Sequence, residues 1–198
     1  GEKPLKCLEL GGRNGGPSLW LALKGHHVVC SDIENPEPIA SKLHQQYTFD
    51  GVVEYAQINA LQIPYESHFD VIIAKSIVGG ISRNGQDHIK KEVIDQVIKA
   101  LKPVGIFLMA ENMQASPMHT WARQKFVNWG DQWNYFTTDD LELLSQFEKV
   151  HCKTTGFFAT FGRNEKQRKS LGVFDQVLEP LIPETYRYVL IAAAQKSQ

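Results

Sequence analysis

A glycine-rich turn between two short apolar runs constrains the fold of this chain more than any other feature. Residues 6–32 read KCLELGGRNGGPSLWLALKGHHVVCSD: an apolar run, four glycines, a helical segment that begins near Pro17, and a second apolar run that ends beside Asp32. This order predicts a strand, a tight turn, a helix and a second strand parallel to the first. Ligands bind beyond the carboxyl ends of the strands in an open parallel sheet, where an acidic residue can accept both hydroxyls of a ribose. The segment therefore predicts a nucleoside-binding βαβ unit.

Strands and helices are predicted to alternate along the rest of the chain. Further strands are expected where short apolar runs recur, at residues 52–58, 70–74, 105–110, 149–157 and 186–194. Helices are expected from apolar periodicity and from breaking residues, at residues 38–47, 86–101, 138–147 and 164–178. Thr138 is expected to cap the third of these. The pattern predicts one α/β domain over residues 1–198, with a mostly parallel, seven-stranded sheet and an antiparallel edge strand.

The composition of the chain argues against several classes of binding partner. The 198 residues include 21 basic and 22 acidic side chains, so the net charge of −1 shows no nucleic-acid footprint, and we expect no DNA partner. No apolar run approaches the roughly 20 residues of a membrane span, so no membrane partner is expected. Cys7, Cys30 and Cys152 are odd in number and widely spaced, which favours reduced cysteines in a cytoplasmic protein. No cluster of Asp, His and Glu suggests a metal site.

The spacing of the glycines distinguishes two nucleoside-binding families. A dinucleotide-binding turn would need glycine at position 13, where this chain has Arg13, so a nicotinamide-dependent oxidoreductase is disfavoured. Glu9, Gly11 and Gly15 resemble the acidic-x-G-x-G-x-G motif of class I S-adenosylmethionine (SAM)-dependent methyltransferases, with Arg13 at the middle glycine. The stretches INALQIPYESHFDVIIAKS, LKPVGIFLMAE and YRYVLIAAAQK resemble later motifs of that family in the same order. The resemblance covers residues 6–196 and implies a Rossmann-like three-layer sandwich.

The resemblance also implies a set of cofactor contacts at one edge of the sheet. They are Glu9, Gly11, Gly12, Gly15, Asp32, Ile33, Asn59, Ala60, Lys75 and Ser76. Glu9 would orient the methionine amino group of SAM, and the glycines would let the backbone pass beneath the methionine moiety. Asp32 would hold the ribose hydroxyls and Ile33 would pack on the adenine, whose edge Asn59 and the backbone of Ala60 would contact. Lys75 and Ser76 would face the methyl donor, and S-adenosylhomocysteine would be the product.

Several of these positions have a second interpretation. Glu9 could instead accept hydrogen bonds from the amides of the turn, and Lys75 could pair with Glu9. The family usually has an acidic residue where this chain has Asn59, so its adenine contact would be weaker. Arg13 could be a solvated loop residue or a part of the cofactor pocket.

Methyl transfer from a sulfonium is an in-line displacement, so positioning supplies much of the catalysis. A general base is needed only when the acceptor carries a proton that must leave. The candidates are Glu111, after the fifth strand, and His119 in the next loop. Residues 113–136 are rich in aromatic side chains and are a candidate lid and acceptor pocket, which Trp121, Trp129 and Trp133 could line. These tryptophans could equally pack the insertion onto the sheet.

The combined prediction is a SAM-dependent methyltransferase that acts on oxygen or nitrogen of a small molecule. The loop AKSIVGG lacks the Asn/Asp-Pro-Pro-aromatic element of enzymes that methylate DNA bases or glutamine amides, which disfavours those substrates. One alternative is a methyltransferase whose acceptor is protein or RNA. Another is a SAM-binding partner subunit without activity, because Arg13 and Asn59 depart from the family pattern. The expected assembly is a monomer or a homodimer.

Overall fold

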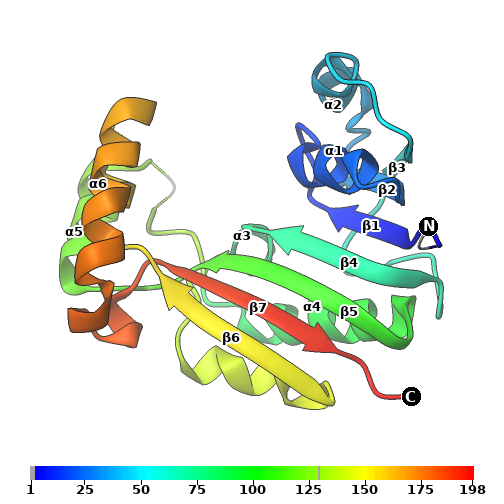
Figure 1. Ribbon diagram of the computed structural model, residues 1–198. Helices are drawn as coiled ribbons and strands as arrows, with labels where there is room; N and C mark the ends of the chain where they lie inside the picture. The colour runs from blue at the N-terminus through cyan, green and yellow to red at the C-terminus, as the bar shows by residue number, and fades with distance from the viewer. Residues whose placement is uncertain (1–2, 129) are drawn as a thin grey trace.

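A seven-stranded sheet forms the centre of the computed structural model, which describes residues 3–128 and 130–198 (Figure 1). The strands are β1 Lys6–Leu10, β2 His27–Asp32, β3 Val52–Gln57, β4 Phe69–Lys75, β5 Leu101–Asn112, β6 Lys149–Thr155 and β7 Val189–Gln195. Their order in the sheet is β3-β2-β1-β4-β5-β7-β6. The pairs among β1 to β5 are parallel, whereas β7 runs antiparallel to both of its neighbours. The expected mostly parallel sheet with an antiparallel strand is confirmed, and β7 lies one position inside the edge.

Helices cover both faces of the sheet, which confirms the three-layer arrangement. The α-helices are α1 Gly16–Leu23, α2 Glu37–His44, α3 Val78–Ile81, α4 Asp87–Ala100, α5 Pro117–Phe126 and α6 Glu165–Leu178. Short 3₁₀ helices occur at η1 Asp139–Gln146, η2 Ala159–Phe161, η3 Glu179–Leu181 and η4 Glu184–Tyr186. Helices α1 and α2 lie beside β1–β3 on one face, α4 lies on the opposite face, and α5 and α6 stand beyond the carboxyl end of β5 (Figure 1).

The apolar faces of the central strands explain where the core lies. Leu8 and Leu10 of β1 pack in the larger core with Val93 of α4, while Cys7 packs on the other face with Leu21 of α1. Alternate residues of one strand therefore serve the two faces of the sheet. Both faces of β1 are buried, so the turn that follows it is held by packing from above and below.

Three local features differ from the sequence-based expectations. Asp32 is the last residue of β2, whereas we expected the strand to end at Cys30 with Asp32 just past it. Helix α5 forms within the aromatic insertion, where no helix was predicted. Residues 139–146 form a 3₁₀ helix, and the expected cap by Thr138 is wrong because its side chain makes no capping hydrogen bond. The carboxylate of Asp140 anchors this segment instead, by accepting from the backbone N–H of Thr137 at 2.8 Å and from Lys90 at 2.9 Å.

One part of the sheet carries an apolar surface on the side of α1. Ile73, Leu108 and Ile191 line an almost wholly apolar groove of about 470 Å³ together with Trp20 of α1. In the described part of the chain, no helix is long and apolar enough to cross a membrane.

Candidate active site

The turn after β1 has a backbone that only glycine adopts without strain at two positions. Gly11 and Gly15 both have φ of +68°, in the left-handed region. A Cβ atom on Gly11 would lie 2.1 Å from Cγ2 of Ile77, and one on Gly15 would lie 2.4 Å from Nε2 of His44. The two glycines therefore allow the turn to approach the loop after β4 and the helix α2.

His44 holds this turn from below. Its Nε2 atom lies 2.8 Å from the carbonyl oxygen of Gly15, and its Nδ1 atom lies 2.7 Å from the hydroxyl of Tyr55. A carbonyl can only accept, so Nε2 carries the proton and Nδ1 accepts from the tyrosine hydroxyl. The buried imidazole therefore links β3 to the glycine turn. Sequence analysis missed His44, because the partner lies 29 residues away along the chain.

Replacing His44 by leucine is expected to lower the free energy of unfolding by about 2 kcal/mol, because two buried hydrogen-bonding groups lose their partner. The turn would also loosen, and the dissociation constant for S-adenosylhomocysteine should rise about tenfold. Urea unfolding and calorimetric titration measure the two effects. Tyr55→Phe is the matched control, since it removes only the distal hydrogen bond and should cost less than about 1 kcal/mol. Equal losses in the two variants would contradict a specific role for the bond to Gly15.

Glu9 lies beneath the turn and is 3% exposed. Its Oε2 atom accepts a hydrogen bond from the backbone N–H of Ser18 at 2.9 Å and another from the Ser18 hydroxyl. Burial raises the pKa of Glu9, while the hydrogen bonds from Ser18 act in the opposite direction. Gly12 passes directly over this carboxylate, since a Cβ there would lie 3.2 Å from Cδ of Glu9. Glu9 thus joins the turn to the start of α1, and its contact with the methionine amino group stays a prediction.

The carboxylate of Asp32 projects from the end of β2 toward the same turn. Its Oδ2 atom accepts from the backbone N–H of Arg13 at 3.0 Å, and its Oδ1 atom accepts from the backbone N–H of Ile33 at 2.7 Å. Each oxygen retains a lone pair for a ligand hydroxyl. The side chain of Ile33 is 59% exposed, so its apolar surface is open to a ligand. Asn59 uses Oδ1 to accept from the backbone N–H of Leu61 at 2.9 Å.

A cavity of about 580 Å³ lies at the carboxyl ends of β1, β2 and β4. It brings together most of the predicted contacts, namely Gly11, Asp32, Ile33, Asn59, Ala60, Lys75 and Ser76. Glu9, Gly12 and Gly15 are outside its lining: Glu9 lies beneath the turn, and the two glycines are part of the turn. Sequence analysis did not assign Arg83 or Ile77 to this cavity, because both follow β4 in a loop without a distinctive motif.

The residues of this cavity fit an adenosine-containing cofactor. The lining includes a carboxylate that can accept hydrogen bonds from hydroxyls, an exposed isoleucine with open apolar surface, and a left-handed glycine that allows close approach of the backbone. A family model described as a methyltransferase domain matches residues 8–109, which is more than half of the chain. The chain belongs to the methyltransferase domain family. The cofactor of this methyltransferase is SAM, and the resemblance to class I SAM-dependent methyltransferases that the sequence motifs indicate is confirmed.

Solved structures share the fold over nearly the whole methyltransferase chain, although no curated protein matches its sequence. A SAM-dependent methyltransferase from Methanosarcina mazei has a TM-score of 0.68 and 16% identity, with 99% of this chain and 94% of that chain covered. Phosphoethanolamine N-methyltransferase 2 from Haemonchus contortus has a TM-score of 0.65 and 13% identity, and the match covers 100% of this chain but 50% of that one. The 1,6-didemethyltoxoflavin-N1-methyltransferase of Burkholderia thailandensis has a TM-score of 0.61 and 15% identity, with 99% and 72% covered.

Glu111 lies next to the carboxyl end of β5 and is fully buried. Its Oε1 atom accepts from the backbone N–H groups of Ile77 and Val78, both at 2.9 Å. Burial raises the pKa of Glu111 to about 7, although these amides lower it in part. The carboxylate therefore fixes the start of α3, which lines the cofactor cavity. Its function as a base or substrate contact stays a prediction.

His119 lies on α5 and is 1% exposed. It lines a different cavity from the one that we assign to the cofactor. Its Nδ1 atom lies 2.7 Å from the hydroxyl of Ser116, and its Nε2 atom lies 3.0 Å from the carbonyl oxygen of Phe157. Burial lowers the pKa of His119. Both ring nitrogens are therefore committed within the protein, and the proposed function of His119 as a base stays a prediction.

The aromatic insertion rests on the loop that follows β4. A Cβ atom on Gly79 would lie 2.3 Å from Nε1 of Trp133, and one on Gly80 would lie 2.7 Å from its Cη2 atom. Trp133 lines both the cofactor cavity and a neighbouring cavity of about 580 Å³. Trp121 lines the cavity of His119 instead, and Trp129 is outside the described residues. The two described tryptophans that we expected in one acceptor pocket therefore line different cavities.

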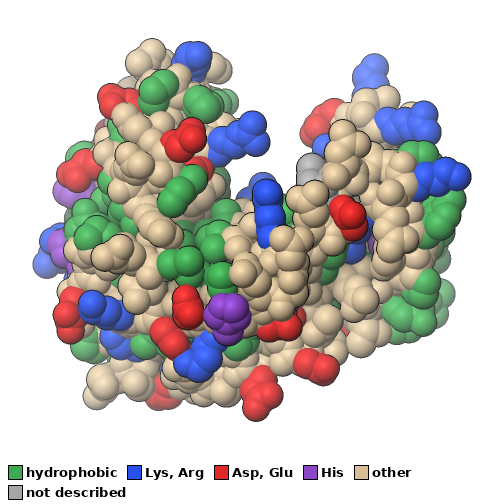
Figure 2. Space-filling view, turned by 180° about the vertical axis from the view of Figure 1, so that it is seen from behind, with side chains coloured by type: hydrophobic (Ala, Val, Ile, Leu, Met, Phe, Trp, Pro, Cys, Tyr) green, Lys and Arg blue, Asp and Glu red, His purple; other side chains and the backbone are tan. Residues whose placement is uncertain are grey.

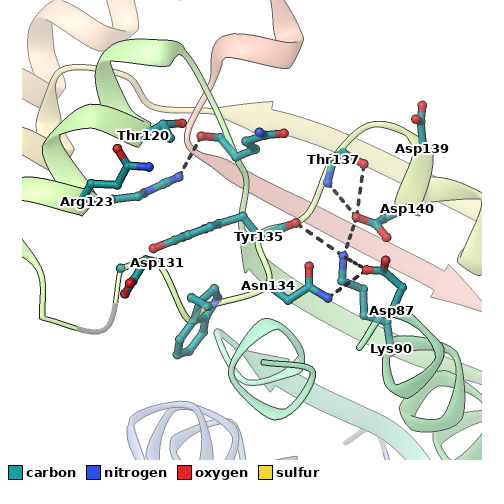
Figure 3. Close-up of a pocket in the computed structure, with 14 residues that line it drawn as sticks. Asp87, Lys90, Thr120, Arg123, Asp131, Asn134, Tyr135, Thr137, Asp139 and Asp140 are labelled. Atoms are coloured by element: carbon teal, nitrogen blue, oxygen red, sulfur yellow. Dashed lines mark hydrogen bonds and ion pairs between the residues drawn. The ribbon is translucent and has the colours of Figure 1, made fainter. Parts of the chain in front are cut away.

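The two buried cations that line the neighbouring cavity, Lys90 and Arg123, both have partners within the protein (Figure 3). Lys90 is buried, with Nζ at 2.9 Å from a carboxylate oxygen of Asp140 and at 3.5 Å from one of Asp87. Arg123 donates to the carbonyl oxygens of Gln114 and Met113 at 2.8 and 2.7 Å. Its guanidinium also lies 3.8 Å from the ring centre of Tyr135. Lys90 also donates to the carbonyl oxygen of Tyr135 at 3.4 Å, which joins the insertion to α4. Both buried cations are therefore engaged within the protein.

A deep cleft separates the part of the methyltransferase that contains α1 and α2 from the part that contains α5 and α6, with Lys and Arg side chains along it (Figure 2). The carboxyl ends of β1 and β4 point toward this gap (Figure 1). In the described residues, no group of three or more His, Cys, Asp or Glu side chains is arranged to hold a metal ion.

Proposed function

We propose that this methyltransferase transfers the methyl group of SAM to an oxygen or nitrogen atom of a small-molecule acceptor. The observation that carries the proposal is a single cavity lined by Asp32 and Ile33 at the end of β2, by Asn59 after β3, and by Lys75 and Ser76 at the end of β4. Asp32 would bind the ribose hydroxyls and Ile33 would pack on the adenine, while the glycine turn would pass beneath the methionine moiety. SAM supplies an activated methyl group on a sulfonium. The protein would align this group with the acceptor and exclude water.

Two solved relatives support a small acceptor. The Haemonchus contortus enzyme was solved with phosphomonomethylethanolamine and S-adenosylhomocysteine, and the Burkholderia thailandensis enzyme with 1,6-didemethyltoxoflavin and S-adenosylhomocysteine. Both are N-methyltransferases by name. Their identity to this chain is 13% and 15%, so they support the size of the acceptor and not its chemistry.

Thermal unfolding with SAM, S-adenosylhomocysteine and NAD, each at equal excess, tests the cofactor assignment. A ligand at about 100 times its dissociation constant stabilises the folded state by roughly 2.7 kcal/mol, which is a readable rise in midpoint. We expect a rise with the first two compounds and none with NAD. Formation of S-adenosylhomocysteine in the presence of candidate acceptors then tests transfer. No rise with either sulfur compound would favour a partner subunit with a degenerate pocket.

A macromolecular acceptor is the second candidate, and α6 is the observation that favours it. Val173, Phe174 and Val177 are exposed on this helix, at 60%, 59% and 71%. Lys166 and Lys169 lie on the same helix and are also exposed. Such an apolar and basic surface can bind a protein or an RNA. Methylation of a peptide or RNA library, lost when Phe174 is replaced by serine, would support this candidate over the first.

We further propose that residues 113–136 act as a lid and that the chain forms one domain, as a monomer or a homodimer. The contact of Trp133 with Gly79 and Gly80 supports the lid, because it places the insertion against the cofactor cavity.

Burial raises the pKa values of Cys7 and Cys30 to about 12, so these free thiols are unreactive. Free cysteines support a cytoplasmic setting.

A further inference from the structure

We infer that the acceptor of this methyltransferase is a carboxylate, which this cavity methylates on oxygen without a general base. The inference rests on the proposed function and names the substrate class for the same site. It starts from three cationic side chains, Arg13, Lys75 and Arg83, that line the cofactor cavity. All three residues are exposed at the cavity. Their side chains form no ion pair with any described residue.

The side chains that line the cavity carry a net positive charge. Among the described residues that line it, Asp32 is the only carboxylate, and its oxygens already accept two backbone N–H groups. SAM carries a sulfonium, an ammonium and one carboxylate, so it adds net positive charge. The carboxylate of SAM can pair with one of the three cations and leaves the other two unpaired. An anionic acceptor would balance them, whereas a cationic amine would be repelled.

The absence of a base in the cavity supports the same conclusion. Its described lining contains no histidine, cysteine or tyrosine. His119 lies in a different cavity with both ring nitrogens bonded, and Glu111 is fully buried at the start of α3. An alcohol or an ammonium acceptor must lose a proton during transfer, and no free group in this lining is placed to take it. A carboxylate is already ionised at neutral pH and needs no base.

The step balances without any further reactant. An oxygen lone pair of the carboxylate forms a bond to the methyl carbon as the bond from that carbon to sulfur breaks. The electron pair of the broken bond stays on sulfur, and no proton is transferred. The products are a methyl ester and a neutral thioether. Lys75 would hold the carboxylate in line, because it ends β4 and borders both the cofactor cavity and the apolar groove of Ile73 and Leu108. This groove could receive an apolar part of the acceptor.

Two nitrogen analogues of SAM test the inference without knowledge of the natural acceptor. In each, nitrogen replaces sulfur, and the methyl group is replaced either by –CH₂CH₂COO⁻ or by its carboxamide –CH₂CH₂CONH₂. Calorimetric titration at 50 mM NaCl should show that the carboxylate binds at least about tenfold more tightly than the carboxamide. The preference should shrink at 500 mM NaCl, because salt screens charges that are exposed to solvent. Lys75→Gln and Arg83→Gln should each reduce it to less than about threefold. The preference is a ratio measured within each variant, so an effect of the substitution on cofactor binding that both analogues share cancels.

Lys42→Gln is the matched control, because Lys42 is an exposed cation on α2 outside the cavity lining, and it should keep the full preference. Equal or tighter binding of the carboxamide by the unmodified protein would overturn the inference, as would a preference that survives both cavity substitutions. Those outcomes leave the proposed function standing if S-adenosylhomocysteine still binds. Failure of S-adenosylhomocysteine and both analogues to bind would overturn the proposed function, and this inference with it.

Discussion

Asp32→Asn is expected to weaken the binding of S-adenosylhomocysteine by about 100-fold or more. Hydrogen bonds to a charged group contribute about 1.5–3 kcal/mol each, and the carboxylate would accept two from the ribose. Its oxygens also receive the backbone N–H groups of Arg13 and Ile33, which set its orientation. An amide in its place must turn an NH₂ group toward one of these donors or toward a ribose hydroxyl. Because 1.4 kcal/mol is a factor of ten in affinity, the loss of these interactions gives the expected change.

Calorimetric titration measures this effect, and Glu34→Gln provides the control. Glu34 is an exposed carboxylate two residues further along the same loop and does not line the cavity. The control removes the same charge and should change the affinity less than about threefold, because an exposed carboxylate outside the cavity interacts with the ligand only through water. The stabilisation of Asp32→Asn by SAM in thermal unfolding should also disappear. An affinity within fivefold of the unmodified protein would show that Asp32 does not hold the ribose.

The parts of the site that could be predicted from the sequence are those set by local order along the chain. The strand, turn, helix and strand of residues 6–32 follow from spacing and breaking residues, and they place Gly11 and Asp32 at one edge of the sheet. A parallel sheet then brings Asn59 and Lys75 to that edge, because the carboxyl ends of its strands coincide. Seven of the ten predicted cofactor contacts consequently line one cavity.

The parts that could not be predicted depend on tertiary contacts. His44 bonds to Gly15 only because α2 packs beneath the turn, and no local pattern distinguishes this histidine from an exposed one. Glu9 and Glu111 both stand at strand ends, where a carboxylate can face a ligand or the protein. In the fold, Ser18 donates to Oε2 of Glu9, and the start of α3 donates to Oε1 of Glu111. The direction of a side chain at a strand end depends on what packs beside it, which spacing does not encode.

Burial of Glu111 has a consequence for stability that can be measured. Burial raises the pKa of its carboxyl to about 7 from an ordinary value of 4.5. Above pH 4.5 the unfolded chain has released this proton, whereas the native protein keeps it until about pH 7. The native state binds more protons in this interval, so the free energy of unfolding contributed by Glu111 falls as pH rises. The shift corresponds to a loss of about 3 kcal/mol between pH 4.5 and pH 7, and no further change above it.

Glu111→Gln should remove this pH dependence. We expect the difference in unfolding free energy, unmodified protein minus variant, to fall by about 3 kcal/mol between pH 4.5 and pH 8 in urea titrations. The difference isolates Glu111 from the buried His119, whose lowered pKa gives a slope of the opposite sign below pH 6.5. Glu148→Gln, at an exposed carboxylate, should leave the slope unchanged.

The same position also allows a test by ligand binding. Glutamine can still accept from Ile77 and Val78, so affinity for S-adenosylhomocysteine should survive in Glu111→Gln but fall in Glu111→Ala, where both amides lose their acceptor. A pH-independent difference would mean that the carboxylate ionises normally in the folded protein, and that these two amides hold its charge against the cost of burial.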